Sequence, residues 1–244
     1  MSKVYAITSG KGGVGKTTIA ANLGVSLSRM RKKTIVVDAD LAMGGIATIF
    51  GLDETPVTLH EVLAGKGSIE KAIYSTQGVN VLPSGPTIVG FLKADPKKLK
   101  GVVDKLAKTY DYVIIDSPPG LNKYSLIPLR NADEVLLVVT PDLPAVQATA
   151  KLRSVIEAVN ANVKGVIVNR LRKPSFFTKL TGAKESMRNE DIERRLKAKI
   201  LGIIPEDPAV IESINMGKSV VVHNPKSSAS KALSALAKDL TQVR

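Results

Sequence analysis

The sequence predicts an α/β fold with a mostly parallel central sheet and helices on both faces. Short β-branched runs recur at 4–8, 34–37, 79–82, 112–115, 135–140, 166–168 and 200–204. Amphipathic stretches separate most of these runs, a pattern typical of parallel strands that helices cover on both sides. The 244 residues contain 44% hydrophobic residues and no internal repeat, low-complexity tract or long linker. We therefore expect a single domain over 1–244.

Two of the connecting helices have recognisable N-termini. Asp95 can cap a helix that has Pro96 at its first position, and apolar residues with helical spacing follow. Asp142 can cap a later helix in the same way. The least regular segment, 173–189, contains Pro174 and Gly182. It is predicted to be either a surface insertion or a plain variable loop.

The composition excludes several classes of protein. The chain has no Cys, which rules out disulfides, cysteine zinc sites and thiolate-held iron–sulfur clusters. Its longest apolar runs fall far short of the ~20 residues that a membrane-spanning helix needs. The first apolar stretch, before Gly10, is also too short for a signal peptide. We expect a cytoplasmic protein.

A phosphate-binding loop follows the first predicted strand. Its residues are Gly10, Lys11, Gly12, Gly13, Val14, Gly15, Lys16, Thr17 and Thr18. They match the pattern G-x-x-x-x-G-K-[ST] between a strand and a helix, which is the setting that this motif requires. Glycines let the backbone N–H groups wrap around a phosphate, and the helix N-terminus adds its dipole. The motif predicts a P-loop NTPase fold in which Lys16 reaches the β- and γ-phosphates and Thr17 is a ligand of Mg²⁺.

Carboxylates follow two further strands of the predicted sheet. Asp38 and Asp40 end the second strand, and Asp116 follows four apolar residues in the arrangement of a Walker B motif. Strand ends of this kind lie at the mouth of an open α/β sheet. Phosphoryl transfer needs a magnesium shell and a positioned water, so two carboxylates at a spacing of two can divide these tasks.

The loop resembles that of the deviant Walker A ATPases, the MinD/ParA family, which reads K-G-G-x-G-K-[ST]. The segment 116–120, D-S-P-P-G, is similar to the second switch of that family. The resemblance implies that Lys11 contacts the nucleotide of the opposing subunit, so that ATP joins two copies into a homodimer. It also implies that Asp38 acts near the metal and that Asp40 orients the attacking water. The implied catalytic residues are thus Lys11, Lys16 and Asp40, with Thr17, Asp38 and Asp116 at the metal.

The same resemblance covers the base of the nucleotide. Family members hold adenine with an Asn and a P-x-D loop after late strands, which places Asn169, Pro205, Glu206 and Asp207 at the base. The Asn amide matches the donor and acceptor edge of adenine. The sequence has no N-K-x-D guanine signature, so ATP is expected rather than GTP.

The resemblance extends from Lys3 to about His223 and is closer to MinD than to ParA, which usually carries a D-P-Q type first switch. It implies an ATP-dependent dimerisation switch in cell division or site positioning, with ATP hydrolysed to ADP and phosphate and an unidentified activating protein. Relatives that hold iron through cysteines are excluded. Two alternatives remain open: a ParA-like protein that binds DNA nonspecifically for segregation, and a P-loop small-molecule kinase or ligase.

The net charge of +13 is concentrated in one region. Residues 164–199 contain 11 Lys or Arg and 4 Asp or Glu, a local charge of +7. This region predicts contact with nonspecific DNA or with the inner face of an anionic membrane, or else a plain basic surface. The C-terminal helix, 227–244, places Leu233, Leu236 and Leu240 on one side. We expect it to pack on the sheet, with a membrane anchor as the alternative.

Several polar residues near strands and helices lack a motif. Asp111, Asp133 and Glu134 flank strands, and we expect all three to be solvated at the surface. His60 is predicted on a surface helix, and His223 at the end of a short strand over 220–222. Both histidines are expected to be structural.

Overall fold

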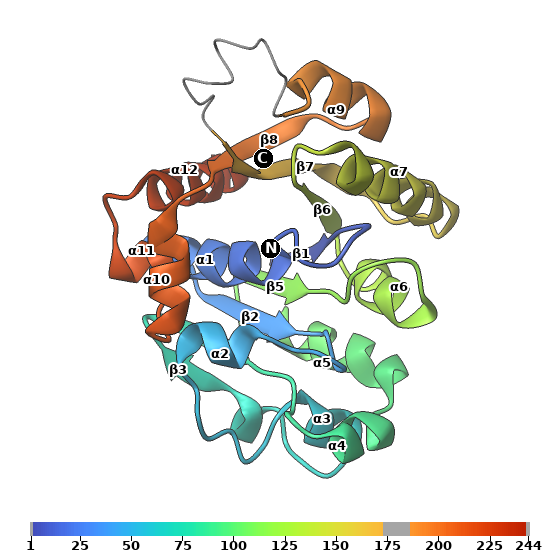
Figure 1. Ribbon diagram of the computed structural model, residues 1–244. Helices are drawn as coiled ribbons and strands as arrows, with labels where there is room; N and C mark the ends of the chain where they lie inside the picture. Colours follow the sequence, from blue (N-terminus) through green and yellow to red (C-terminus); the bar gives the residue numbers. More distant parts are fainter. Residues whose placement is uncertain (1, 173–185, 243–244) are drawn as a thin grey trace.

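A computed structural model describes residues 2–172 and 186–242, and it contains one sheet between two layers of helices (Figure 1). The strands of this sheet are β1 (Lys3–Thr8), β2 (Thr34–Asp38), β3 (Tyr74–Thr76), β4 (Val79–Leu82), β5 (Tyr112–Asp116), β6 (Glu134–Val139), β7 (Val163–Leu171) and β8 (Ile200–Pro205). Within the described residues their order is β3-β4-β2-β5-β1-β6-β7-β8. Only β3 runs antiparallel to its neighbour, and the other paired strands are parallel.

The helices form two groups that cover opposite faces of the sheet. One face is covered by α1 (Lys16–Arg29), α2 (Ile46–Phe50), α10 (Pro208–Asn215), α11 (Val220–His223) and α12 (Ser228–Gln242). The core on the other face includes α3 (Leu59–Leu63), α5 (Leu99–Leu106), α6 (Lys123–Arg130), α7 (Leu143–Ala158) and α9 (Asn189–Leu196). The short α4 (Ile88–Lys93) contacts α3. Two 3₁₀ turns, η1 (Glu70–Ala72) and η2 (Pro96–Lys98), complete the described elements.

The predicted fold class is confirmed, and each of the seven β-branched runs forms a strand. The central strands are almost fully buried, as the continuous apolar runs indicate. The predicted caps are present as well. Asp95 accepts a hydrogen bond from the Lys97 N–H at 3.0 Å, and Asp142 accepts one from the Ala145 N–H at 3.0 Å. Sequence reasoning missed β3, a three-residue edge strand with no buried residue.

Three local predictions are wrong. Residues 220–222 form helix α11 and not a strand, because the Ser219 hydroxyl caps this segment by accepting from the Val222 N–H. Glu134 is buried, since β6 lies between β1 and β7 and both neighbouring strands supply a lysine. Lys3 lies 3.1 Å and Lys164 lies 3.2 Å from its carboxylate. His60 is on a helix as predicted, but it is only 1% exposed.

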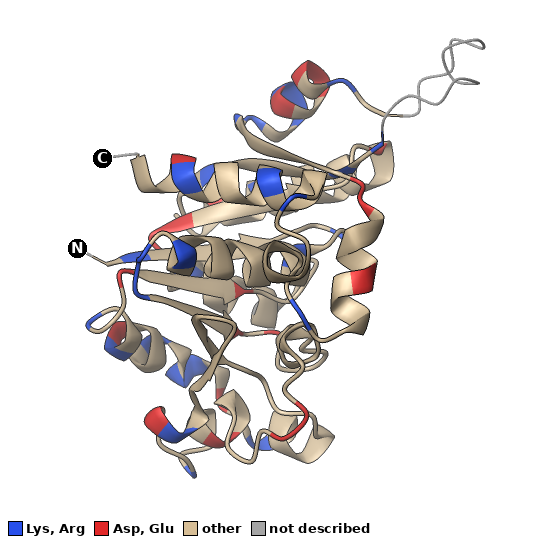
Figure 2. Ribbon diagram, turned by 90° about the vertical axis from the view of Figure 1, so that its left-hand side faces the viewer, with Lys and Arg blue, Asp and Glu red and all other residues tan. Residues whose placement is uncertain are grey.

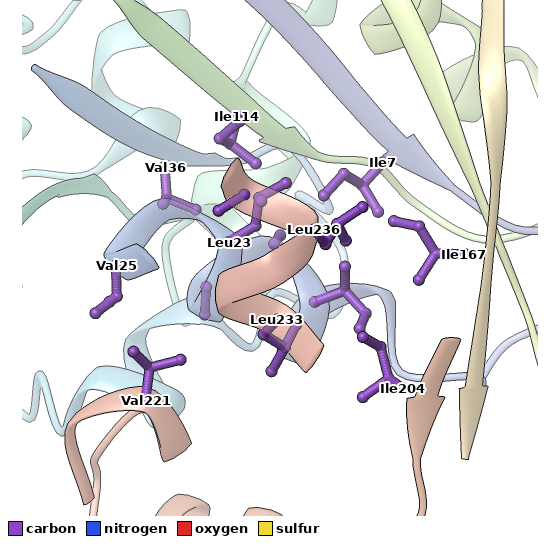
Figure 3. Close-up of a cluster of buried hydrophobic side chains, with 14 of the residues drawn as sticks. Ile7, Leu23, Val25, Val36, Ile114, Ile167, Ile204, Val221, Leu233 and Leu236 are labelled. Carbon is purple, nitrogen blue, oxygen red and sulfur yellow. The ribbon is translucent and has the colours of Figure 1, made fainter. Parts of the chain in front are cut away.

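The C-terminal helix is part of the core, as expected. Leu233, Leu236 and Leu240 are at most 4% exposed. Figure 3 shows Leu233 and Leu236 of α12 in the same buried cluster as Leu23 of α1 and Ile204 of β8. No helix in the described part of the chain is both long and apolar enough to cross a membrane. A membrane anchor formed by α12 would have to take these leucines out of the core.

Most of the predicted insertion, 173–185, lies outside the described residues. Its last part is ordered by contacts with the domain: the Met187 N–H donates to the Pro141 carbonyl at 2.8 Å, and Asn189 is already the first residue of α9. The predicted boundary at 189 is therefore too late.

The burial of α12 leads to a stability prediction. Replacing Leu236 with Ala should lower the free energy of unfolding by about 2–5 kcal/mol, because it leaves a cavity between α12, α1 and β8. Urea denaturation measures this change, with Lys238→Ala on the exposed side of the same helix as the control. Equal stability of the two variants would contradict the packing described here.

Candidate nucleotide-binding site

The predicted phosphate loop connects β1 to α1 and has left-handed glycines where the motif requires them. Gly13 has φ +79° and Gly15, which precedes α1, has φ +95°. Two close approaches also demand glycine. A Cβ on Gly15 would lie 2.2 Å from Asn169 Nδ2, and one on Gly10 would lie 2.2 Å from the carbonyl carbon of Ala148 in α7. The loop therefore fits tightly between α7 and the end of β7.

Hydrogen bonds from three other segments hold this loop in place. Asn169 Nδ2 donates to the Val14 carbonyl at 2.8 Å, and the Gly10 N–H donates to Thr149 Oγ1 at 3.1 Å. From the β5 side, the Gly120 N–H donates to the Ser9 carbonyl at 3.0 Å. Because the loop is fixed by its surroundings, its N–H groups are arranged before any anion binds.

Asp38 and Asp116 lie side by side at the carboxyl end of the sheet. They are paired residues of β2 and β5, and both are buried. Asp38 accepts hydrogen bonds from the Asp40 N–H at 3.2 Å and the Ile46 N–H at 3.1 Å. Neither oxygen of Asp116 accepts a hydrogen bond of good geometry from the described residues.

The pKa values of this pair are shifted upward. Burial, together with the nearby Asp116, raises the pKa of Asp38 to about 8. Burial also raises the pKa of Asp116 to about 6, although the Lys16 ammonium and the Thr17 hydroxyl favour its charged form. Burying two adjacent charged carboxylates costs less free energy when a cation neutralises their charge.

These residues fit a magnesium ion that is bound together with a phosphate. Within residues 2–172 and 186–242 no group of three or more His, Cys, Asp or Glu side chains gathers to form a protein-only metal site. The two carboxylates and Thr17 would instead supply a few oxygen ligands. Mg²⁺ is usually held in this way, by one or two carboxylates, waters and substrate phosphates. The unpaired oxygens of Asp116 are the observation that favours such an ion.

Asp40 and Lys11 lie near the site but are more accessible. Asp40 is half-buried, and its Oδ1 accepts from the Met43 N–H at 3.2 Å. Lys11 is exposed and lines a cavity of about 370 Å³ beside the loop. Their roles in positioning water and in contacting a second copy stay predictions.

The cavity beside Lys11 has walls that sequence reasoning only partly anticipated. It is lined by Lys11, Gly12, Gly13, Val14, Thr140, Pro141, Asp142, Arg170, Arg172, Ser186 and Glu206. Sequence reasoning did not place six of these residues at the site, namely Thr140, Pro141, Asp142, Arg170, Arg172 and Ser186. In the sequence, the signal for Arg170 was its position directly after Asn169. In the structure, Arg170 has a φ of +56°, which is unusual for a residue other than glycine.

The residues predicted at the base lie on the neighbouring strands β7 and β8 and on the segment that follows β8. Glu206 lines the cavity and pairs with Arg172 at 2.7 Å, whereas Asn169 lies behind the loop. Asp207 caps two helices: its Oδ1 accepts from the Ala209 N–H at 3.1 Å, and its Oδ2 accepts from the Ala229 N–H at 2.9 Å. Pro205 ends β8. Contact of these four residues with adenine stays a prediction.

The fold and the loop together define a P-loop nucleotide-binding protein, and the comparisons with known proteins narrow this class. A family model described as an AAA domain matches residues 2–168. An ATP-binding protein of Methanocaldococcus jannaschii is 39% identical over 241 residues, which cover 98% of this chain and 88% of the relative. The septum site-determining protein MinD of Thermotoga maritima is 33% identical, with 98% and 88% coverage.

Solved structures with a similar fold indicate the same class of protein. The cell division ATPase MinD of Pyrococcus furiosus has a TM-score of 0.91 and 35% identity, and each chain is covered completely. MinD of Pyrococcus horikoshii in complex with Mg-ADP has a TM-score of 0.90 and 34% identity, with 99% and 97% coverage. A complex of MinC and MinD from Aquifex aeolicus contains a chain with a TM-score of 0.86 and 33% identity, with 100% and 97% coverage. This chain belongs to the MinD/ParA family of P-loop ATPases.

The raised pKa of Asp38 predicts how stability depends on pH in the absence of metal and nucleotide. The folded chain holds this proton more tightly than the unfolded chain, where the carboxyl pKa is 3.8, so stability should fall as the pH rises toward about 8. Asp38→Asn removes this titration. The unfolding free energy of the variant relative to wild type should therefore increase between about pH 5 and about pH 8.

Urea denaturation in EDTA over a series of pH values measures this difference, and Asp104→Asn, at an exposed position of α5, is the matched control. A difference for Asp38→Asn that does not change with pH would contradict the proposed burial of two coupled carboxyl groups.

Proposed function

We propose that this chain is an Mg²⁺-dependent ATPase that acts as a dimerisation switch of the MinD type, in the spatial organisation of cell division. The observation that carries the proposal is the combination of a fixed phosphate loop, the buried pair Asp38 and Asp116, and a second lysine, Lys11, exposed at the rim. A nucleotide-binding enzyme that works as a monomer needs only the first two of these features.

The loop binds the phosphates of ATP. Its N–H groups and the N-terminus of α1 attract the anion, and the buried Lys16 places a cation at the terminal phosphates. Asp38, Asp116 and Thr17 would hold the magnesium ion, and the bound ion would neutralise charge that develops on the phosphates. Because Lys16 and the ion face the same buried carboxylates, ATP and Mg²⁺ are expected to bind together.

Hydrolysis resets the switch. Asp40, two residues beyond Asp38, orients the attacking water, and its more accessible position suits contact with solvent. Lys11 projects from the loop toward a second copy and contacts the nucleotide held there. A cation that arrives from a partner stabilises the charge of the transition state only after dimerisation.

Charge pairing in the basic region 164–199 bears on the surface that the dimer contacts. Within the described part of 164–199, several cations are paired with acidic residues: Arg188 and Arg194 both contact Asp191, and Lys164 contacts Glu134. In Figure 2 the ribbon of α9 carries both acidic and basic residues. This pairing reduces the positive charge available for DNA or lipid headgroups. Nonspecific DNA binding of the ParA type therefore ranks second to the MinD-type switch.

Lys11 should be needed for dimerisation but not for nucleotide binding. Lys11→Ala should bind ATP with wild-type affinity and stay monomeric with ATP and Mg²⁺, because the missing cation serves the other subunit. Lys16→Ala is the matched comparison, and it should bind ATP on the order of 100-fold more weakly. Nucleotide titration and analytical ultracentrifugation measure both properties. A Lys11→Ala protein that dimerises as wild type does would disprove the role in trans.

Asp40 should be needed for hydrolysis but not for assembly. Asp40→Ala should lower kcat by about 100-fold or more while ATP is still bound, so the dimer accumulates. Size-exclusion chromatography with ATP and Mg²⁺ follows the dimer, and phosphate release follows turnover. The exposed Asp53→Ala is the control. If Asp40→Ala remains a monomer under these conditions, the switch model fails.

A further inference from the structure

His60 is a buried histidine that the proposed mechanism does not use. It lies in the short helix α3 and is 1% exposed. Its Nε2 lies 2.9 Å from the main-chain carbonyl oxygen of Leu41. Because a carbonyl oxygen only accepts hydrogen bonds, the ring proton is on Nε2 and His60 is the donor. This bond connects α3 to the segment that follows β2, which carries Asp40.

The ring of His60 is held in one orientation by its surroundings. The start of α3 is fixed by a capping box between Thr58 and Glu61, in which the Thr58 N–H donates to Glu61 Oε2 at 2.8 Å. The His60 N–H also donates to Thr58 Oγ1 at 3.2 Å. On its other side the ring contacts two glycines. A Cβ on Gly85 would lie 2.4 Å from Nδ1, and one on Gly90 would lie 2.7 Å from it. The imidazole therefore has little freedom to turn away from Leu41.

The segment that His60 holds is the one that places Asp40. At its start, the Ala39 N–H donates to the Asp116 carbonyl at 2.9 Å, and the Asp40 N–H donates to Asp38 Oδ1 at 3.2 Å. At Leu41 the hydrogen bond from His60 ties the segment to α3. The Asp40 side chain thus projects from a stretch that is fixed to the metal-site carboxylates before it and to His60 after it.

We propose that His60 is a positioning residue for Asp40: its Nε2–H fixes the Leu41 carbonyl and thereby the direction of the Asp40 carboxylate. The proposal rests on the proposed function of Asp40 in orienting water. His60 does not belong to the residues that line the cavity beside the loop, so its loss should change turnover and leave ATP binding intact. A misplaced carboxylate lowers the rate of the chemical step, but it does not weaken the binding of phosphate by the loop.

Two substitutions of His60 separate the hydrogen bond from the volume of the ring. His60→Leu fills similar space without a donor, whereas His60→Gln can place an amide N–H near the position of Nε2. We expect His60→Leu to lower kcat about tenfold at an unchanged KM for ATP, and His60→Gln to restore at least half of the wild-type kcat. His223→Leu, on the opposite face of the sheet, is the matched control and should match wild type.

Three results would overturn the proposal: wild-type kcat in His60→Leu, no rescue by His60→Gln, or a weaker affinity for ATP equal in size to the loss of kcat. If His60→Leu does not fold, Gly90→Ala decides, because its Cβ would push against the ring from α4. A lower kcat at unchanged ATP affinity supports the proposal, and a wild-type kcat contradicts it.

Failure of this inference can be told apart from failure of the proposed function. If Asp40→Ala loses turnover and His60→Leu does not, only the positioning role is wrong. If wild-type protein with Mg²⁺ releases no phosphate from ATP, or Asp40→Ala turns over normally, the proposed function itself is wrong and the role of His60 falls with it.

Discussion

Two carboxyl groups buried side by side at the end of the sheet are the constraint on which this site depends. Asp38 and Asp116 occupy paired positions of β2 and β5, where neither can move away from the other without breaking the sheet. Burying two like charges costs free energy, and this cost raises the pKa values of both carboxyl groups. A magnesium ion held by Thr17 and these carboxylates would offset that cost, which would link the fold to the binding of a metal nucleotide.

The phosphate loop depends on a second constraint, which is space. Two of its glycines approach a neighbouring backbone or side chain so closely that no Cβ fits, and Asn169 closes the gap with a hydrogen bond to Val14. Contacts with α7 and β7 therefore hold the loop in one conformation. The two lysines of the loop therefore differ in exposure. Lys16 is buried near Asp116, whereas Lys11 is exposed and lines the cavity beside the loop.

The sequence predicted the features that follow from local pattern. Apolar runs marked the parallel strands, and the glycine spacing of 10–17 marked the loop, because both patterns reflect constraints within a few residues. It did not predict what depends on contacts between distant segments. The burial of Glu134 requires lysines from both neighbouring strands. The position of Arg170 beside the loop accompanies a positive φ at this residue and a shift in the register between β7 and β8. Likewise His60 looked like a surface residue because α3 alone does not reveal the glycines that enclose its ring.

The most direct test of the account measures the protons that Mg-ATP displaces. Asp38 has a raised pKa of about 8, so at about pH 7 the empty site holds close to one proton that the cation should expel. Isothermal titration calorimetry of wild-type protein with Mg-ATP, in buffers of different ionisation enthalpy, counts these protons. We expect the release of about one proton per subunit, and much less from Asp38→Asn. Tight binding of Mg-ATP by wild type with no proton release would contradict the account.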